Sequence, residues 1–74
     1  MGVGGKIKEY LAENGISQTF ISAKTGIELP KLNQVLNGNR KMKLEEYELI
    51  CWALNVNTDK FLMPRSPESF NQFN

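Results

Sequence analysis

Amide and amine side chains are the groups with which this sequence can do chemistry, and they concentrate between residues 18 and 41. The 74 residues include nine Lys plus Arg, eight Asp plus Glu, one Cys and no His. Without histidine, a Ser-His-Asp or Cys-His catalytic arrangement and an imidazole metal ligand are both excluded. A single cysteine, Cys51, can supply neither an internal disulfide nor a tetrahedral zinc site. We therefore expect a binding function that needs no cofactor and no metal.

The one cluster of carboxylates does not change this expectation. Glu45, Glu46 and Glu48 fall in the first turns of an expected helix. Carboxylates at a helix N-terminus interact favourably with the helix dipole, which gives them a structural reason to be there. Because no base or metal partner accompanies them, an enzyme is the least favoured of the functions considered.

The formal charge of +1 conceals an uneven distribution along the chain. Residues 24–43 contain five basic residues and one acidic residue, whereas residues 44–74 contain five acidic and two basic ones. Such a basic segment indicates a surface for a polyanion, and the alternative is ordinary solvated surface. No apolar run approaches the roughly 20 residues that span a bilayer, and no signal peptide is recognisable. We expect a cytoplasmic protein without a membrane partner.

Short helices separated by turn residues are expected to position these side chains, with no strand pattern anywhere. Ser17 is a suitable N-cap, and Pro30 suits the first turn of a helix. The length allows one domain, expected over residues 1–62, followed by a mobile tail over 63–74. The apolar spacing and the turn signals predict five helices, at about 4–13, 18–24, 29–37, 44–54 and 58–62.

Residues 18–37 satisfy the steric demands of a helix-turn-helix unit. A small residue, Ser22, stands where the second helix crosses the first, and Gly26 stands in the turn, where a positive φ is needed. Apolar residues are also in place to lock the two helices together, namely Ile21, Ile27, Leu32 and Val35.

These residues resemble a known family, the Cro/phage-repressor (Xre-like) helix-turn-helix domains. The resemblance rests on Ser17-Gln18 through Gly26-Ile27, then Leu32, Val35 and Asn37-Gly38, and continues through Leu44–Tyr47, Ile50-Cys51, Ala53–Val56 and Asp59–Leu62. It implies an all-α, compact five-helix bundle that binds double-stranded DNA sequence-specifically, generally as a homodimer. The function it implies is a transcriptional regulator of bacterial, phage or mobile-element origin, with repressor as the favoured role.

The resemblance also implies where DNA would be contacted. The recognition helix, about 29–37, would enter the major groove, where Asn33 and Gln34 could pair with adenine. Gln18 would meet a phosphate at the N-terminus of the preceding helix, and Lys31 could reach a phosphate or guanine. The full set of expected DNA-binding residues is Gln18, Thr19, Leu29, Lys31, Asn33, Gln34, Asn37, Asn39, Arg40 and Lys41.

One departure from the family pattern bears on specificity. Family members often carry polar readers at the positions of Leu29 and Pro30, which are apolar here. Hydrogen-bonded readout would then rest on Lys31, Asn33 and Gln34, with Leu29 limited to a thymine methyl. The alternative function is therefore an antitoxin or protein-interaction module of the same fold. Such a module would bind its partner through Phe20, Trp52 or the tail residues Phe70 and Phe73.

Overall fold

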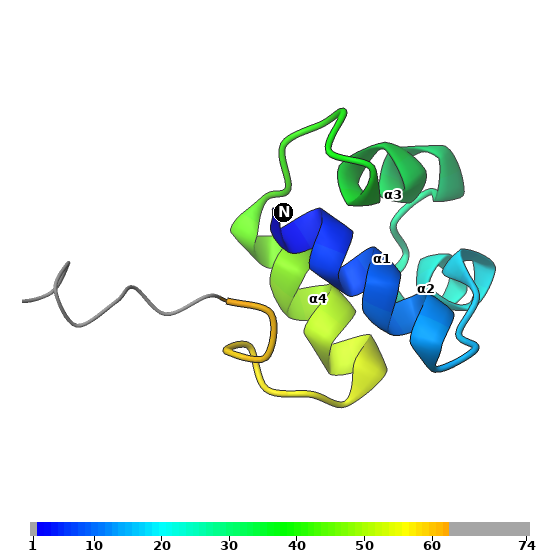
Figure 1. The fold of residues 1–74 in the computed structure, drawn as a ribbon. Coiled ribbons are helices and arrows are strands. Elements are labelled where there is room, and N and C mark those ends of the chain that lie inside the picture. Colours follow the sequence, from blue (N-terminus) through cyan, green and yellow to red (C-terminus); the bar gives the residue numbers. More distant parts are fainter. Residues whose placement is uncertain (1, 63–74) are drawn as a thin grey trace, which may run out of the picture.

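Four helices make up the structure, a computed structural model that describes residues 2–62 (Figure 1). They are α1 (Val3–Glu13), α2 (Gln18–Thr25), α3 (Leu29–Leu36) and α4 (Leu44–Leu54). No strand occurs in this range, which confirms the all-α class, and each of these helices lies within about one residue of its predicted bounds. The tail expected over 63–74, with Phe70 and Phe73, lies outside the described residues.

The prediction of a fifth helix at about 58–62, and with it of a five-helix bundle, is wrong. Residues 58–61 form turns, in which Lys60 N–H donates to Asn57 O at 3.0 Å and Leu62 N–H donates to Asp59 O at 3.3 Å. Five residues offer too few hydrogen bonds to offset the cost of starting a helix. Tertiary contacts hold the segment instead: the Phe61 side chain is buried, and the Tyr47 hydroxyl donates to Thr58 O.

One apolar core receives side chains from every helix. In α3 the buried residues Leu32, Val35 and Leu36 follow the i, i+3, i+4 spacing of a single helix face. Leu44, although apolar, is 68% exposed because it is the first residue of α4 and lies beyond the core. The core cluster consists of Ile7, Leu11, Ile21, Ile27, Leu32, Leu36, Tyr47, Ile50, Cys51, Ala53 and Phe61.

The turn between α2 and α3 is held by local hydrogen bonds. Ser17 caps α2 as predicted, its hydroxyl accepting from Phe20 N–H at 3.0 Å. At the other end Gly26 has φ 81°, a left-handed conformation that glycine adopts without strain. Ser22 Oγ then donates to Ile27 O at 2.5 Å, and Ile27 N–H donates to Thr25 Oγ1 at 3.2 Å. Together these contacts fix the direction in which α3 leaves α2.

Helices α1 and α3 pack closely because α1 carries glycine at the contact. A Cβ atom at Gly4 would lie 2.5 Å from Val35 O and 3.2 Å from Leu36 Cα. Both are backbone atoms of the last turn of α3, so they cannot move aside as a flexible side chain would. The apolar face of α3 thereby packs against α1, and the polar face of α3 points outward.

We predict that Gly4→Ala destabilises the protein, although alanine is the better helix former by about 1 kcal/mol. The added methyl group must push α1 away from α3, and overpacking of this kind costs about 1–3 kcal/mol. Urea unfolding followed by circular dichroism measures the change. A variant more stable than the wild type would contradict the close approach.

Candidate nucleic-acid interface

The outward face of α3 is polar and exposed, as the sequence predicts. Asn33, Gln34 and Asn37 are exposed there, and Leu29 and Pro30 are exposed at the start of the helix. Beside them Thr19 is exposed at the start of α2, and Gln18 is half-buried. The face therefore combines amide groups able to donate and accept hydrogen bonds with a small apolar end.

Three of the expected binding residues are joined in one chain of hydrogen bonds. Asn33 Nδ2 donates to Gln18 Oε1 at 3.3 Å, and Asn37 Nδ2 donates to Asn33 Oδ1 at 3.0 Å. The chain ends at Lys8 of α1, whose ammonium donates to Asn37 Oδ1 at 2.5 Å. Each side chain in such a chain restrains the orientation of the next. The start of α2, the middle of α3 and one cation of α1 thus form a single polar surface.

Lys8 is a residue of this surface that sequence reasoning missed. Its charge is balanced by that of Glu9, the next residue in the sequence, and it lies outside the basic segment 24–43. Its contact with Asn37 spans 29 residues. The local pattern carries no signal of a contact at that separation; only the packing of α1 on α3 brings the two side chains together.

A basic loop adjoins the C-terminal end of α3. Asn39, Arg40 and Lys41 are all exposed, and Asn39 N–H donates to Gln34 O at 2.9 Å, which ties the loop to the helix. Within residues 2–62 no ion pair or side-chain hydrogen bond engages Arg40 or Lys41. Their charges remain available to an anion that approaches the α3 face.

Two other basic residues of the 24–43 segment are held by side chains of the protein itself. The Lys24 ammonium lies 5.6 Å from the ring centroids of both Phe20 and Trp52, a cation–π arrangement. The Lys31 ammonium lies 2.9 Å from Glu46 Oε2. The positive charge counted along the sequence is therefore only partly presented on the α3 face. The DNA contact expected of Lys31 stays a prediction, and it competes with this ion pair.

Glu46 is buried, and both of its carboxylate oxygens are engaged. Oε2 pairs with Lys31, while Oε1 accepts from the Lys43 backbone N–H at 2.9 Å and so caps the start of α4. The hydrogen bond with Lys31, then that with the Lys43 N–H, lower the pKa of Glu46, and burial opposes them. The position of Glu46, third in an expected helix, is a capping signal that can be read from the sequence. Nothing in the local sequence indicates that Glu46 pairs with Lys31.

Two apolar features lie outside the polar face. Phe20 and Trp52, 49% and 62% exposed, share the Lys24 cation and form what we call the aromatic patch, residues Phe20, Lys24 and Trp52. Cys51, which precedes Trp52 in the sequence, is buried, and burial raises the pKa of its thiol. A buried, protonated thiol is a poor nucleophile, which agrees with a packing role.

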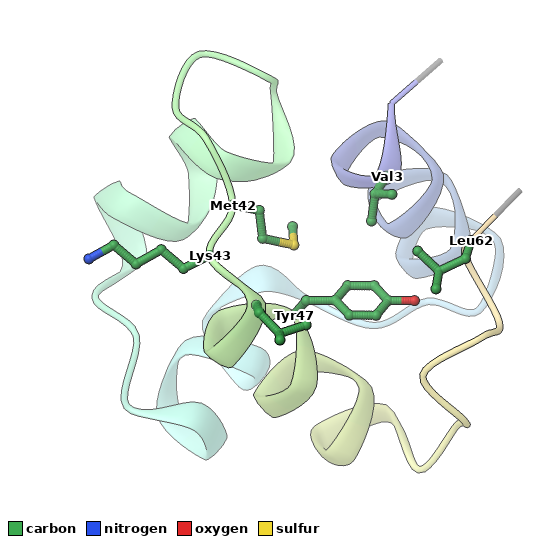
Figure 2. A pocket seen from close by; sticks show the side chains of 6 residues that line it. Val3, Met42, Lys43, Tyr47 and Leu62 are labelled. Carbon is green, nitrogen blue, oxygen red and sulfur yellow. The ribbon is translucent and has the colours of Figure 1, made fainter.

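The second apolar feature is a groove of about 270 Å³ between the N-terminal turns of α1 and α4 (Figure 2). Val3, Met42 and Leu62 turn their side chains toward it, whereas the Lys43 side chain points away from them. We call it the apolar groove; its lining is Val3, Met42, Lys43, Leu44, Tyr47 and Leu62.

Comparison with known proteins gives one match. A family model, described as a Cro/C1-type HTH DNA-binding domain, matches residues 6–62. No curated protein and no solved structure matches the chain. The family match spans all four helices apart from the first residues of α1, and so includes the polar face, the basic loop and Glu46. Among residues 2–62 no helix is long and apolar enough to cross a membrane.

We predict a pH dependence of stability that traces to Glu46. Because its folded pKa lies below the usual 4.5, the stabilisation is complete above about pH 4.5 and is lost as the pH falls through the folded pKa. With Lys31 31% exposed, we expect about 1–2 kcal/mol, between the ~0.2–1 kcal/mol of exposed pairs and the ~3–5 kcal/mol of buried ones.

Urea unfolding between pH 7 and pH 3 measures this effect. Glu46→Gln should remove that part of the pH dependence, whereas Glu45→Gln, a change at the exposed neighbour, should leave it in place. Equal pH profiles for the wild type and Glu46→Gln would contradict the assignment.

Proposed function

The chain belongs to the Cro/C1-type HTH DNA-binding domain family, and from this membership we propose that it is a sequence-specific regulator of transcription. The observation that carries the proposal is the continuous polar face from Gln18 through Asn33 to Asn37, bordered by Arg40 and Lys41. It brings amides that can pair with base edges and cations that can bind phosphates onto one exposed surface, formed by the start of α2, by α3 and by the loop that follows α3. We propose no enzymatic activity and no cofactor.

In the proposed complex α3 lies in the major groove, which is wide enough for one helix. Asn33 and Gln34 face the base edges, where an amide pairs with adenine through two hydrogen bonds. Leu29 offers its apolar side chain to a thymine methyl group. The bond from Asn33 to Gln18 restrains the amide before DNA arrives, so less side-chain freedom is lost on binding.

Phosphate contacts would surround the readers and set the register of α3 in the groove. Gln18 and Thr19 stand at the N-terminus of α2, where backbone N–H groups and the helix dipole favour an anion. On the other side Asn37, Asn39, Arg40 and Lys41 can meet the next phosphates.

We further propose that the protein is a repressor of bacterial, phage or mobile-element origin and acts in the cytoplasm. A domain that covers its binding site excludes other proteins from it, and this suffices for repression. Because Leu29 and Pro30 are apolar, few side chains of α3 can form hydrogen bonds with bases, so the specificity of one domain is modest. A second copy of the chain would double the number of base pairs that are read.

Homodimerisation through the apolar groove would supply that second copy. Leu44 and Leu62 are 68% and 52% exposed at its rim, and clustered exposed leucines favour association. A two-fold dimer places its α3 helices on half-sites about 34 Å apart, one turn of DNA. The DNA site would then be close to palindromic.

The alternative function, an antitoxin or other protein-interaction module, is favoured by the aromatic patch. Exposed Phe and Trp side chains are enriched where proteins bind one another. A partner on this patch could act together with DNA binding or in place of it. A small toxin-like reading frame beside the gene would support this alternative.

Selection of a DNA motif from a random duplex library tests the proposed function. We predict that Asn33→Ala costs about 1–3 kcal/mol on the selected site and relaxes the preference at one base pair. Lys41→Ala should weaken binding to all duplexes alike and flatten the salt dependence, because it removes a phosphate contact. Lys60→Ala, a change of a basic residue outside the polar face, is the control. Failure to enrich any motif would contradict sequence-specific regulation.

Sedimentation equilibrium tests the dimer. We predict that Leu44→Glu shifts the protein to monomer by placing a charge in the apolar groove. Leu49→Glu, at a 40% exposed leucine of the same helix outside the groove, should leave the association constant close to that of the wild type. Equal dissociation of the two variants would contradict the placement of the interface.

A further inference from the structure

Lys31 stands on the recognition helix, yet its cation is turned toward α4. Its Nζ lies 2.9 Å from Glu46 Oε2, and the Glu46 side chain is only 9% exposed. This is the one ion pair found between residues 2 and 62, and it links α3 directly to the start of α4 across the basic loop. By contrast Arg40 and Lys41 are exposed with no such partner in the same range.

Glu46 cannot readily release this cation to DNA. Its other oxygen caps the Lys43 N–H at 2.9 Å, so the carboxylate is fixed in place by the helix that carries it. If Lys31 left for a phosphate, the nearly buried carboxylate would lose the one ion pair that it makes with the described residues. An unpaired buried charge is strongly unfavourable, and a DNA phosphate offers Lys31 no more than the carboxylate does.

We propose that Glu46 is a positioning residue that limits the affinity for DNA in general: by holding Lys31 against α4, it withdraws one cation from the DNA-binding face. The proposal rests on the proposed function. A phosphate contact binds every sequence alike, whereas an amide that pairs with a base edge binds one sequence better. Withdrawing a cation from α3 lowers the affinity for every duplex and leaves the reading by Asn33 and Gln34 intact.

The apolar start of α3 leaves the amides as the main readers. Leu29 and Pro30 contribute no hydrogen bonds to bases, so the amides supply most of the discrimination. An additional phosphate contact on the same helix would raise the affinity for all duplexes alike and would add nothing to this discrimination.

A set of charge variants tests the proposal through the salt dependence of DNA binding. Affinities of the full chain for its selected duplex and for a scrambled duplex are measured by fluorescence anisotropy over a range of KCl concentrations. Glu46→Gln can still accept from the Lys43 N–H but cannot pair with Lys31 as an ion. Glu45→Gln is the matched control, because it also removes one negative charge from the first turn of α4 while leaving the ion pair.

We expect Glu46→Gln to release Lys31 toward the phosphates. The slope of log K against log salt should steepen by about 0.9 relative to Glu45→Gln, one phosphate contact. Binding to the selected duplex and to the scrambled duplex should tighten by about the same factor, several-fold, at low salt. Lys31→Met should keep the wild-type slope, and the double variant Lys31→Met/Glu46→Gln should return to it. The double variant contains no unpaired carboxylate at position 46, so its salt slope can be measured even if Lys31→Met does not fold. Circular dichroism checks that each variant is folded.

Two results would overturn the proposal. One is a slope that flattens by about 0.9 in Lys31→Met, as expected for Lys41→Ala, since Lys31 would then already contact a phosphate. The other is an equal slope for Glu46→Gln and Glu45→Gln. In both cases the wild type still selects a DNA motif, so the result would contradict the role of Glu46 and not the proposed function. If the wild type selects no duplex at all, the proposed function itself fails.

Discussion

The left-handed turn at Gly26 determines how the helices of this protein are arranged. Its left-handed backbone reverses the chain between α2 and α3, and the Ser22 and Thr25 hydroxyls secure Ile27 immediately after it. With this turn fixed, α3 buries Leu32, Val35 and Leu36. The amide side chains lie on the opposite face of the helix and are therefore exposed. The exposed face is therefore a consequence of packing, and it exists before any ligand arrives.

Contacts from both neighbouring helices then set what that face presents. From α1, the glycine at position 4 allows backbone to approach backbone, which brings Lys8 within reach of Asn37. From α4, Glu46 draws Lys31 inward. Residues of the same chemical type thus have different roles: one lysine extends the polar face, another is withheld from it, and a third, Lys24, lies over two aromatic rings.

Local signals explain how much could be predicted from the sequence. Apolar spacing, the Ser17 cap and the Gly26 turn act within a few residues, so the bounds of α1 to α4 and the outward face of α3 were predictable. The segment 58–62 was mistaken for a helix because tertiary contacts, from Tyr47 to Thr58 and around buried Phe61, decide its conformation. The partners of Lys8 and Lys31 were not predictable, because they lie 29 and 15 residues away and depend on how finished helices pack.

In the proposed function, α3 together with the start of α2 is the surface that reads DNA. The most direct measurement is an NMR titration of ¹⁵N-labelled protein with its selected duplex, following backbone and side-chain amide signals. The largest shifts are expected on the side-chain amides of Gln18, Asn33 and Gln34, and on the backbone of the basic loop. Shifts centred on the aromatic patch, with the α3 amides unchanged, would contradict this assignment of the DNA-binding surface.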